Sequence, residues 1–316
     1  MLLTRRNLLK GLGAGAALGL GAYFSVLPKR SFAQAAAAPV RALNRFQLGD
    51  WTLTAIQDGL AQLPASVLGA NVDEATLAAY LAENNLPTDA FRATVTVMLI
   101  ETGDDVILMD TGNGAGETSG SLVPTLEVLG LSAADVTQVI LSHYHPDHVL
   151  GAGDMNSMAF PNALYHIGEA EWNYLQQDAS GTPFAEIVAL ANGILAPASA
   201  AEQIALYSDE QELLPGIQAL ATPGHTPGHM AFQLSSGGQN LLLTVDAAIS
   251  SLVSLQNPGW YFGFDSDPVQ AVETRTALFG RAADEDLLTF GYHFPFPGIG
   301  YIERMGEGFR FTPAQV

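Results

Sequence analysis

The segment "LSHYHPDHVLG", residues 141–151, places three histidines and one aspartate within six positions. The whole chain has only seven histidines, so this segment concentrates side chains that could bind a metal ion. Neutral imidazole and carboxylate groups suit zinc, and also manganese or iron. A single histidine at a strand end is more often an ordinary buried or surface residue, whereas the H-x-H-x-D-H spacing is much more specific. The segment therefore predicts a metal site that includes His143, His145, Asp147 and His148.

A centre with two cations needs more than four protein ligands, and three later segments supply candidates. The turn sequence "TPGHTPGH", residues 222–229, contains His225 and His229. The run "LLLTVDAA" ends an apolar strand on Asp246, where a buried carboxylate would be costly without a cation. The run "LLTFGYHFPFPG" similarly ends a strand on His293. The chain thus offers enough imidazole and carboxylate groups for two cations.

The first histidine cluster follows an apolar run that is typical of a β-strand, "DVTQVI" at residues 135–140. Because side chains alternate along an extended chain, His143 and His145 should point to the same side. Pro146 should end the strand, so that the adjacent aspartate and histidine open the next turn.

Strand and helix patterns run through two successive β-rich halves, and each half carries part of the histidine set. No linker or short-period repeat divides them. The pattern predicts one α/β domain in which two sheets lie between outer helices. The individual expectations are a strand pair leading to Asp58-Gly59, a helix over 73–84 capped by Asp73, a hairpin turning at Gly103-Asp104, a helix from about Gly168 and a helix over 267–284.

Composition narrows the class of protein. At 316 residues, with 48% hydrophobic and 14% charged residues, the chain can bury a large core. The net charge of −20 would repel a nucleic-acid polyanion, and we expect no such partner. The chain has no cysteine, so any metal site must use imidazole and carboxylate ligands rather than thiolates.

The N-terminal sequence "MLLTRRNLLKGLGAGAALGLGAYFSVLPKRSFAQA" has paired Arg5 and Arg6, a glycine-rich apolar stretch and a small-residue cleavage site. These features predict a signal peptide of the bacterial twin-arginine type over residues 1–35. A membrane anchor is the alternative. We expect recognition by the twin-arginine export machinery, a periplasmic or secreted location, and a single domain over residues 36–316.

With these motifs in this order, from "LMDTGNG" at Asp110 through His293, the sequence resembles the metallo-β-lactamase superfamily. The resemblance implies a four-layer αββα sandwich and a binuclear centre. It also implies that His229 and His166 are structural. The implied ligands are His143, His145 and His225 for the first metal, Asp147, His148 and His293 for the second, and Asp246 as the bridge between them.

The ligand types suggest hydrolysis. Two divalent cations, zinc in the first place and manganese, cobalt or iron as alternatives, can share a hydroxide whose parent water has a lowered pKa. That hydroxide could attack a carbonyl carbon or phosphorus, and Asp147 could also pass a proton to the leaving group.

The tail "GYHFPFPGIGYIERMGEGFRFTP" is similar to the end of methyl parathion hydrolase and its relatives, within the lactonase and organophosphate-hydrolase branch. One departure is Val245, which replaces the usual glycine before the bridging aspartate. An apolar substrate pocket could be formed by Trp260, Tyr261, Phe294 and Phe296, although ordinary core packing is the alternative for each.

The sequence therefore predicts an exported binuclear metallohydrolase that opens lactones or cleaves aryl esters and phosphotriesters. Its expected partner is a small apolar ester or lactone, and a homodimer is an open alternative to a monomer. Three other functions stay open at this point: a β-lactamase-type amide hydrolase, a mononuclear iron oxidoreductase of the persulfide-dioxygenase type, and a metal-binding protein without catalysis.

Overall fold

The computed structural model describes residues 42–114 and 120–315. The predicted signal peptide, residues 1–35, lies outside this range. Among the described helices, none is both long and apolar enough to cross a membrane.

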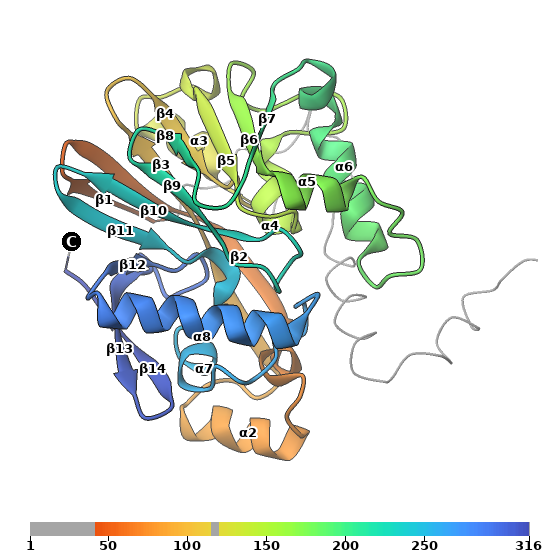
Figure 1. Ribbon diagram of the computed structural model, residues 1–316, viewed down its shortest axis with the longest axis vertical. Coiled ribbons are helices and arrows are strands. Elements are labelled where there is room, and N and C mark those ends of the chain that lie inside the picture. Colours follow the sequence, from red (N-terminus) through yellow and green to blue (C-terminus); the bar gives the residue numbers. More distant parts are fainter. Residues whose placement is uncertain (1–41, 115–119, 316) are drawn as a thin grey trace, which may run out of the picture.

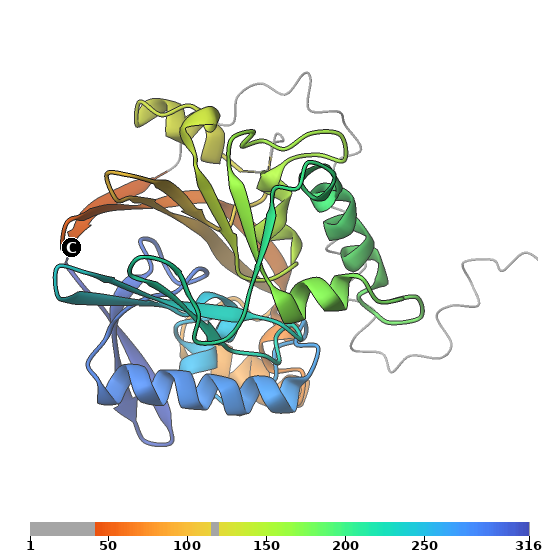
Figure 2. The ribbon, with the colours of Figure 1, turned by 45° about the horizontal axis from the view of Figure 1, so that its top comes forward.

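Two seven-stranded sheets face each other, and helices cover their outer faces (Figures 1 and 2). The predicted four-layer αββα sandwich is confirmed. The first sheet has the order β1-β2-β3-β4-β5-β6-β7 and the second has the order β14-β13-β12-β11-β10-β9-β8, so each half of the chain builds one sheet. The strands of the first sheet are β1 (Leu43–Leu48), β2 (Trp51–Pro64), β3 (Ala90–Glu101), β4 (Val106–Met109), β5 (Gln138–Leu141), β6 (Leu164–Gly168) and β7 (Ile204–Tyr207). Those of the second are β8 (Glu212–Leu214), β9 (Ile217–Ala221), β10 (Met230–Ser236), β11 (Gln239–Leu243), β12 (Leu288–Phe290), β13 (Ile299–Met305) and β14 (Gly308–Pro313).

The helices arise from both halves of the chain. Figure 2 shows α8 along the outer side of the second sheet, while α5 and α6 lie beside the first sheet. The helices are α2 (Glu74–Glu83), α3 (Leu122–Val128), α4 (Pro146–Val149), α5 (Glu169–Leu175), α6 (Ala185–Ala200), α7 (Val253–Gln256) and α8 (Pro268–Asp284).

The second sheet is buried on both faces, as its side chains show. In β11, Leu241 and Leu243 belong to the core between the sheets, whereas Leu242 packs in a separate cluster with Leu278 and Phe279 of α8. Because successive side chains of a strand point to opposite faces, a continuous apolar run is needed to cover both. The run "LLL" at 241–243 therefore encodes a strand between two apolar layers.

Most of the predicted elements are confirmed. The helix over 73–84 forms as α2, and the side chain of Asp73 accepts a hydrogen bond from the backbone N of Thr76, as expected for an N-cap. The hairpin of β3 and β4 and helices α5 and α8 also form where the sequence placed them.

Two expectations need correction. The strand pair does not end at Asp58-Gly59, because β2 passes through a bulge between Gln57 and Gly59 and continues to Pro64. Helix α6 was not predicted; it contains Gly193 and Pro197 and has no side-chain cap, so the usual helix signals are weak.

Candidate metal centre

The histidine-rich segment lies at the C-terminal end of β5, near the middle of the first sheet. After β5 ends at Leu141, His143 and His145 lie in an extended loop. Pro146 then occupies the first turn of α4, a position where its missing N–H costs nothing. Asp147 and His148 lie in the same single-turn helix. All four candidate ligands are buried.

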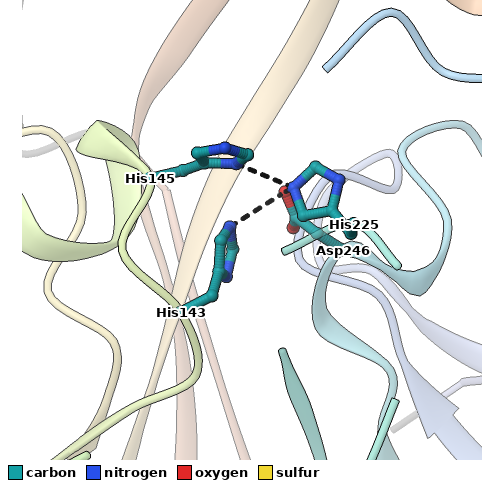
Figure 3. Close-up of side chains that lie close together, drawn as sticks. All are labelled: His143, His145, His225 and Asp246. Carbon is teal, nitrogen blue, oxygen red and sulfur yellow. Dashed lines mark hydrogen bonds and ion pairs between the residues drawn. The ribbon is translucent and has the colours of Figure 1, made fainter. Parts of the chain in front are cut away.

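The second sheet supplies the other three candidates. His225 lies between β9 and β10, Asp246 in a short turn after β11, and His293 after β12. Figure 3 shows His143 and His145 on one side, pointing toward His225 and Asp246 on the other. The ligand atoms form two groups, each within 4.8 Å: His143, His145, His225 and Asp246 in one, and Asp147, His148 and His293 in the other.

Asp246 lies between the two groups. Its Oδ2 is 3.3 Å from Nε2 of His225 and 3.7 Å from Nε2 of His143, both in the first group. Its Oδ1 is 3.3 Å from Nε2 of His148 and 3.2 Å from Nε2 of His293, both in the second. Nε2 of His293 also lies 3.3 Å from Oδ2, so this ring meets both oxygens. The carboxylate therefore lies between the two groups, which is the position that a bridging ligand requires.

The buried polar atoms fit bound cations. Within the described residues, Nε2 of His143, His145 and His148 and Oδ1 of Asp246 are buried and form no hydrogen bond. Ring nitrogens do lie 3.2–3.3 Å from Asp246 Oδ1, but without hydrogen-bond geometry. Buried polar atoms are normally satisfied, so such unpartnered atoms at the ligand groups suit metal coordination. His145 turns its other ring nitrogen, Nδ1, to Nε2 of His225 at 2.8 Å.

Burial also favours the neutral form of two imidazoles, which is the form that binds a metal ion. Burial, reinforced by neighbouring histidines, lowers the pKa of His143 and His145 well below the usual value. For Asp246 the burial that opposes ionisation is outweighed by His293 and His148, which hold its pKa well below the usual range. His143 and His145 are therefore neutral beside a carboxylate, and both groups are ligands that zinc binds. Although burial opposes it, Asp246 and its neighbouring carboxylates raise the pKa of His148, His225 and His293.

Three of the candidate ligands are held by outer contacts, that is, by hydrogen bonds to the ring nitrogen that points away from the ligand groups. The sequence did not reveal these contacts. Nδ1 of His148 lies 2.8 Å from Oδ2 of Asp110, and Nδ1 of His293 lies 2.7 Å from the carbonyl oxygen of Thr94. Nδ1 of His225 lies 3.0 Å from Oδ1 of Asp265. Such contacts fix the ring orientation and direct the opposite nitrogen to the metal. No short-range signal marks them, although Asp110 does end a predicted strand.

The carboxylate of Glu171 in α5 joins the two histidine loops. Its Oε1 accepts a hydrogen bond from the backbone N of Tyr144, and its Oε2 accepts hydrogen bonds from the hydroxyl of Thr226 and the backbone N of Gly228. Burial raises the pKa of this carboxyl to about 7, although the three donors oppose the shift. Glu171 therefore fixes the loop of the first sheet relative to the loop of the second.

The glycines of "TPGHTPGH" allow two helices to approach the His225 loop closely. Gly224 has a φ of +123°, and a Cβ there would lie 2.2 Å from the backbone N of Ala271 in α8. A Cβ on Gly228 would lie 2.1 Å from the backbone N of Glu171 in α5. Any larger residue would push α8 or α5 away from the site.

The two remaining histidines lie outside the ligand groups. Nε2 of His229 accepts a hydrogen bond from the backbone N of Asp246, while its Nδ1 contacts the hydroxyl and carbonyl oxygens of Thr222. Both ring nitrogens of His229 are thus engaged in hydrogen bonds that position the bridging candidate. His166 contacts the side chain of Gln138 on the neighbouring strand.

A cavity of about 410 Å³, including the part open to solvent, adjoins the candidate ligands. Asp147 reaches the cavity, and the wall is otherwise largely apolar. The lining residues besides the candidate ligands are Ala61, Leu63, Ala93, Pro146, Ile187, Ile249, Phe262 and Phe264.

The aromatic residues predicted for this pocket do not line it. Trp260 packs edge-on against Tyr80, with the ring centroids 5.0 Å apart, and Tyr261 is not part of the wall. Phe294 is fully buried in the cluster beneath α8, because its side chain diverges from that of His293. Phe296 packs against the main core. The aromatic wall comes instead from Phe262 and Phe264.

The sequence model described as the "Metallo-beta-lactamase superfamily" matches residues 91–291, well over half of the chain. The chain belongs to the metallo-beta-lactamase superfamily. An N-acyl homoserine lactonase from Bacillus sp is 28% identical over 203 residues, which cover 57% of this chain and 74% of that protein.

Solved structures of superfamily members extend the likeness to almost the whole chain. That of AidC, a dizinc quorum-quenching lactonase in complex with the product N-hexanoyl-L-homoserine, matches with a TM-score of 0.81 and 27% identity, over 88% of this chain and 99% of that one. That of the hydrolase AbOPH matches with a TM-score of 0.80 and 25% identity, over the same shares. This superfamily member is a metal-dependent hydrolase that resembles lactonases, and its two candidate metal sites support a binuclear centre.

The residue before Asp246 shows why the resemblance implies glycine there. Val245 has a φ of +47°, a region that β-branched residues rarely enter and that costs about 1–3 kcal/mol. Its side chain is nevertheless buried in the core of this superfamily member. The backbone strain at Val245 lowers the free energy of unfolding, whereas the burial of its side chain raises it.

We therefore expect Val245→Gly to lower the free energy of unfolding by less than about 1 kcal/mol, because relief of strain offsets the lost burial of about 1.5–3 kcal/mol. The matched control is Val139→Gly in β5, which is fully buried in a regular strand and should cost more than about 3 kcal/mol. Urea unfolding of both variants tests this, and equal losses would contradict the strain at Val245.

Proposed function

We propose that this protein is a binuclear metallohydrolase that opens neutral lactones and cleaves neutral esters with an apolar acyl group. The observation that carries the proposal is the position of the Asp246 carboxylate between the two ligand groups, beside an apolar cavity. The similarity to N-acyl homoserine lactonases supports the lactone as substrate class.

Each of the two groups of candidate ligands would hold one metal ion. Two divalent cations, zinc in the first place, would lower the pKa of a water molecule and polarise the substrate carbonyl. One ion would be held by His143, His145 and His225, and the other by Asp147, His148 and His293, with Asp246 in contact with both.

The chain's own groups position the reaction. Asp147 lies at the cavity wall, where its carboxylate could pass a proton to the leaving oxygen. Ile187, Ile249 and Phe262 would bind the acyl group and exclude water from the reacting carbonyl.

The charge of the cavity distinguishes lactones from β-lactam antibiotics. Among the described residues that line it, none is a lysine or arginine. A β-lactam carboxylate would lose its hydration there without gaining a cationic side chain as partner. A neutral lactone or ester has no such cost, and the same reasoning allows neutral phosphotriesters as a side activity.

The test compares substrates on purified protein of known metal content. We expect close to two ions per chain and hydrolysis of N-hexanoyl homoserine lactone and p-nitrophenyl butyrate, both abolished by chelation and restored by metal. We expect slower turnover of methyl paraoxon and of a carboxylate-bearing β-lactam. A complete lack of lactone and ester hydrolysis in metal-loaded protein would refute the proposal, and about one iron per chain with oxygen uptake would favour the oxidoreductase.

Export is a separate part of the proposal. The twin-arginine sequence of residues 1–35 supports a periplasmic or secreted location and recognition by the export machinery. Because that route carries folded proteins, metal could be loaded before export.

A further inference from the structure

Arg275 is a buried cation that the proposed chemistry does not use. It lies in the middle of α8, its side chain is 1% exposed, and it is absent from the cavity wall described above. A buried guanidinium is costly unless it is paired and hydrogen-bonded. Its contacts should therefore reveal which parts of the fold depend on it.

The guanidinium joins three segments. Its Nε donates to the carbonyl oxygen of Ala247 at 2.6 Å, and its Nη1 donates to the carbonyl oxygens of Pro258 at 3.2 Å and Trp260 at 3.0 Å. Its Nη2 donates to Oδ2 of Asp265 at 3.4 Å. Because a guanidinium is a planar fork with fixed donor directions, these bonds fix the three segments relative to one another.

Each segment leads directly to the metal centre or the cavity. Ala247 follows Asp246, whose two oxygens face the two ligand groups. The other oxygen of Asp265, Oδ1, lies 3.0 Å from Nδ1 of His225. The chain between Trp260 and Asp265 carries both aromatic residues of the cavity wall.

We propose that Arg275 is a positioning residue that aligns His225 and Asp246 for the metal ions and holds the aromatic wall of the substrate cavity in register with them. The inference rests on the proposed metal centre. Arg275 holds the Asp265 carboxylate where it accepts the Nδ1 proton of His225, so that Nε2 of the same ring faces the first ligand group. The bond to Ala247 fixes the backbone next to Asp246.

Lysine cannot replace this arrangement. An ammonium group is a compact charge with three donors, so it cannot reach four acceptors that are spread over three segments. Arg275→Lys should keep the charge beside Asp265 and lose most of the carbonyl bonds. Arg275→Met should lose both while keeping an unbranched apolar stem in place of the methylene chain.

The experiment measures metal binding and kinetics separately on the full chain. Cobalt(II) is titrated into chelated protein and followed by its visible absorption, and kcat and KM are measured for p-nitrophenyl butyrate. The variants are Arg275→Met, Arg275→Lys and Asp265→Asn. The control is Arg281→Met on the same helix, because the side chain of Arg281 donates hydrogen bonds to Glu285 and Gln233, away from the ligand groups.

We expect Arg275→Met to weaken cobalt binding by about 10- to 100-fold, the loss typical of an outer-contact residue, and to raise KM. Arg275→Lys should show a smaller loss. Asp265→Asn should weaken cobalt binding but change KM less than Arg275→Met does, since the carbonyl bonds of Arg275 remain and only the bond from the backbone N of Phe262 to Oδ2 of Asp265 is altered at the wall. Arg281→Met should change neither quantity more than twofold.

Unchanged cobalt binding in a folded Arg275→Met variant would overturn the inference. If that variant does not fold, unchanged binding in both Arg275→Lys and Asp265→Asn would overturn it equally. Wild-type protein that binds no cobalt would refute the metal centre itself. Wild-type protein that binds cobalt but hydrolyses no ester would refute the proposed substrate, and the cobalt titrations would still decide the role of Arg275.

Discussion

Asp246→Asn is expected to lose both metal ions and to lower the rate of ester hydrolysis by about a thousandfold or more, beyond the 10- to 100-fold typical of outer-contact residues. The change is nearly isosteric and removes one negative charge. Its effect is large because the Asp246 carboxylate faces four histidine nitrogens at 3.2–3.7 Å, two in each ligand group. An amide supplies a donor where the histidines and cations need a charged acceptor.

Metal analysis and thermal unfolding test this expectation together. Added zinc should raise the Tm of chelated wild-type protein, because an ion that binds only the folded state adds about 2.7 kcal/mol at a concentration of 100 Kd. The Tm of Asp246→Asn should not respond. The control is Asp284→Asn, an exposed carboxylate paired with Arg304, which should respond as wild type does. Asp246→Asn protein with two ions and a rate within tenfold of wild type would contradict the bridging role.

His145→Ala is expected to lower the metal content from close to two ions toward about one per chain, and the hydrolysis rate by more than about a hundredfold. We expect the loss of one ion rather than two because the candidate ligands form two separate groups. His145 belongs only to the group with His143 and His225, while Asp147, His148 and His293 keep their positions. The second ion should therefore remain.

The matched control for His145→Ala is His166→Ala. His166 is a largely buried histidine of the first sheet, but its ring contacts Gln138 rather than the ligand groups. It should keep both ions and the wild-type rate. A His145→Ala variant with wild-type turnover would remove His145 from the metal centre, and one that loses both ions would mean that the second group cannot bind metal alone.

The orienting contacts could not be read from the sequence. Asp110 and His148 are 38 positions apart, and Asp265 and His225 are 40 apart. The first pair meets when β4 and β5 pair in the first sheet, and the second pair meets when the segment before α8 packs against the His225 loop. An aspartate at such a distance has no spacing relation to its histidine, whereas the H-x-H-x-D-H segment carries its relation locally.

The aromatic wall of the cavity also could not be predicted residue by residue from the sequence. The aromatic run "WYFGF", residues 260–264, marked the right segment, yet the predicted Trp260 and Tyr261 lie off the cavity while Phe262 and Phe264 line it. In an irregular segment the direction of each side chain depends on where the backbone is held. Here the hydrogen bonds to Arg275 and from the backbone N of Gly263 to the carbonyl oxygen of Val67 decide it.

The sequence by itself determined the fold class and the residues that gather at the candidate centre. Strand periodicity is local, and each candidate ligand stands at or just beyond the end of an apolar strand, where neighbouring strands of a sheet finish at a common edge. Only the tertiary structure decided that Asp246 lies between the two groups and which aromatic residues line the cavity. It also placed Arg275 of α8 within hydrogen-bonding distance of the backbone next to Asp246 and of the backbone that leads to the aromatic wall. Those relations arise from packing between distant segments, and no periodicity along the chain encodes them.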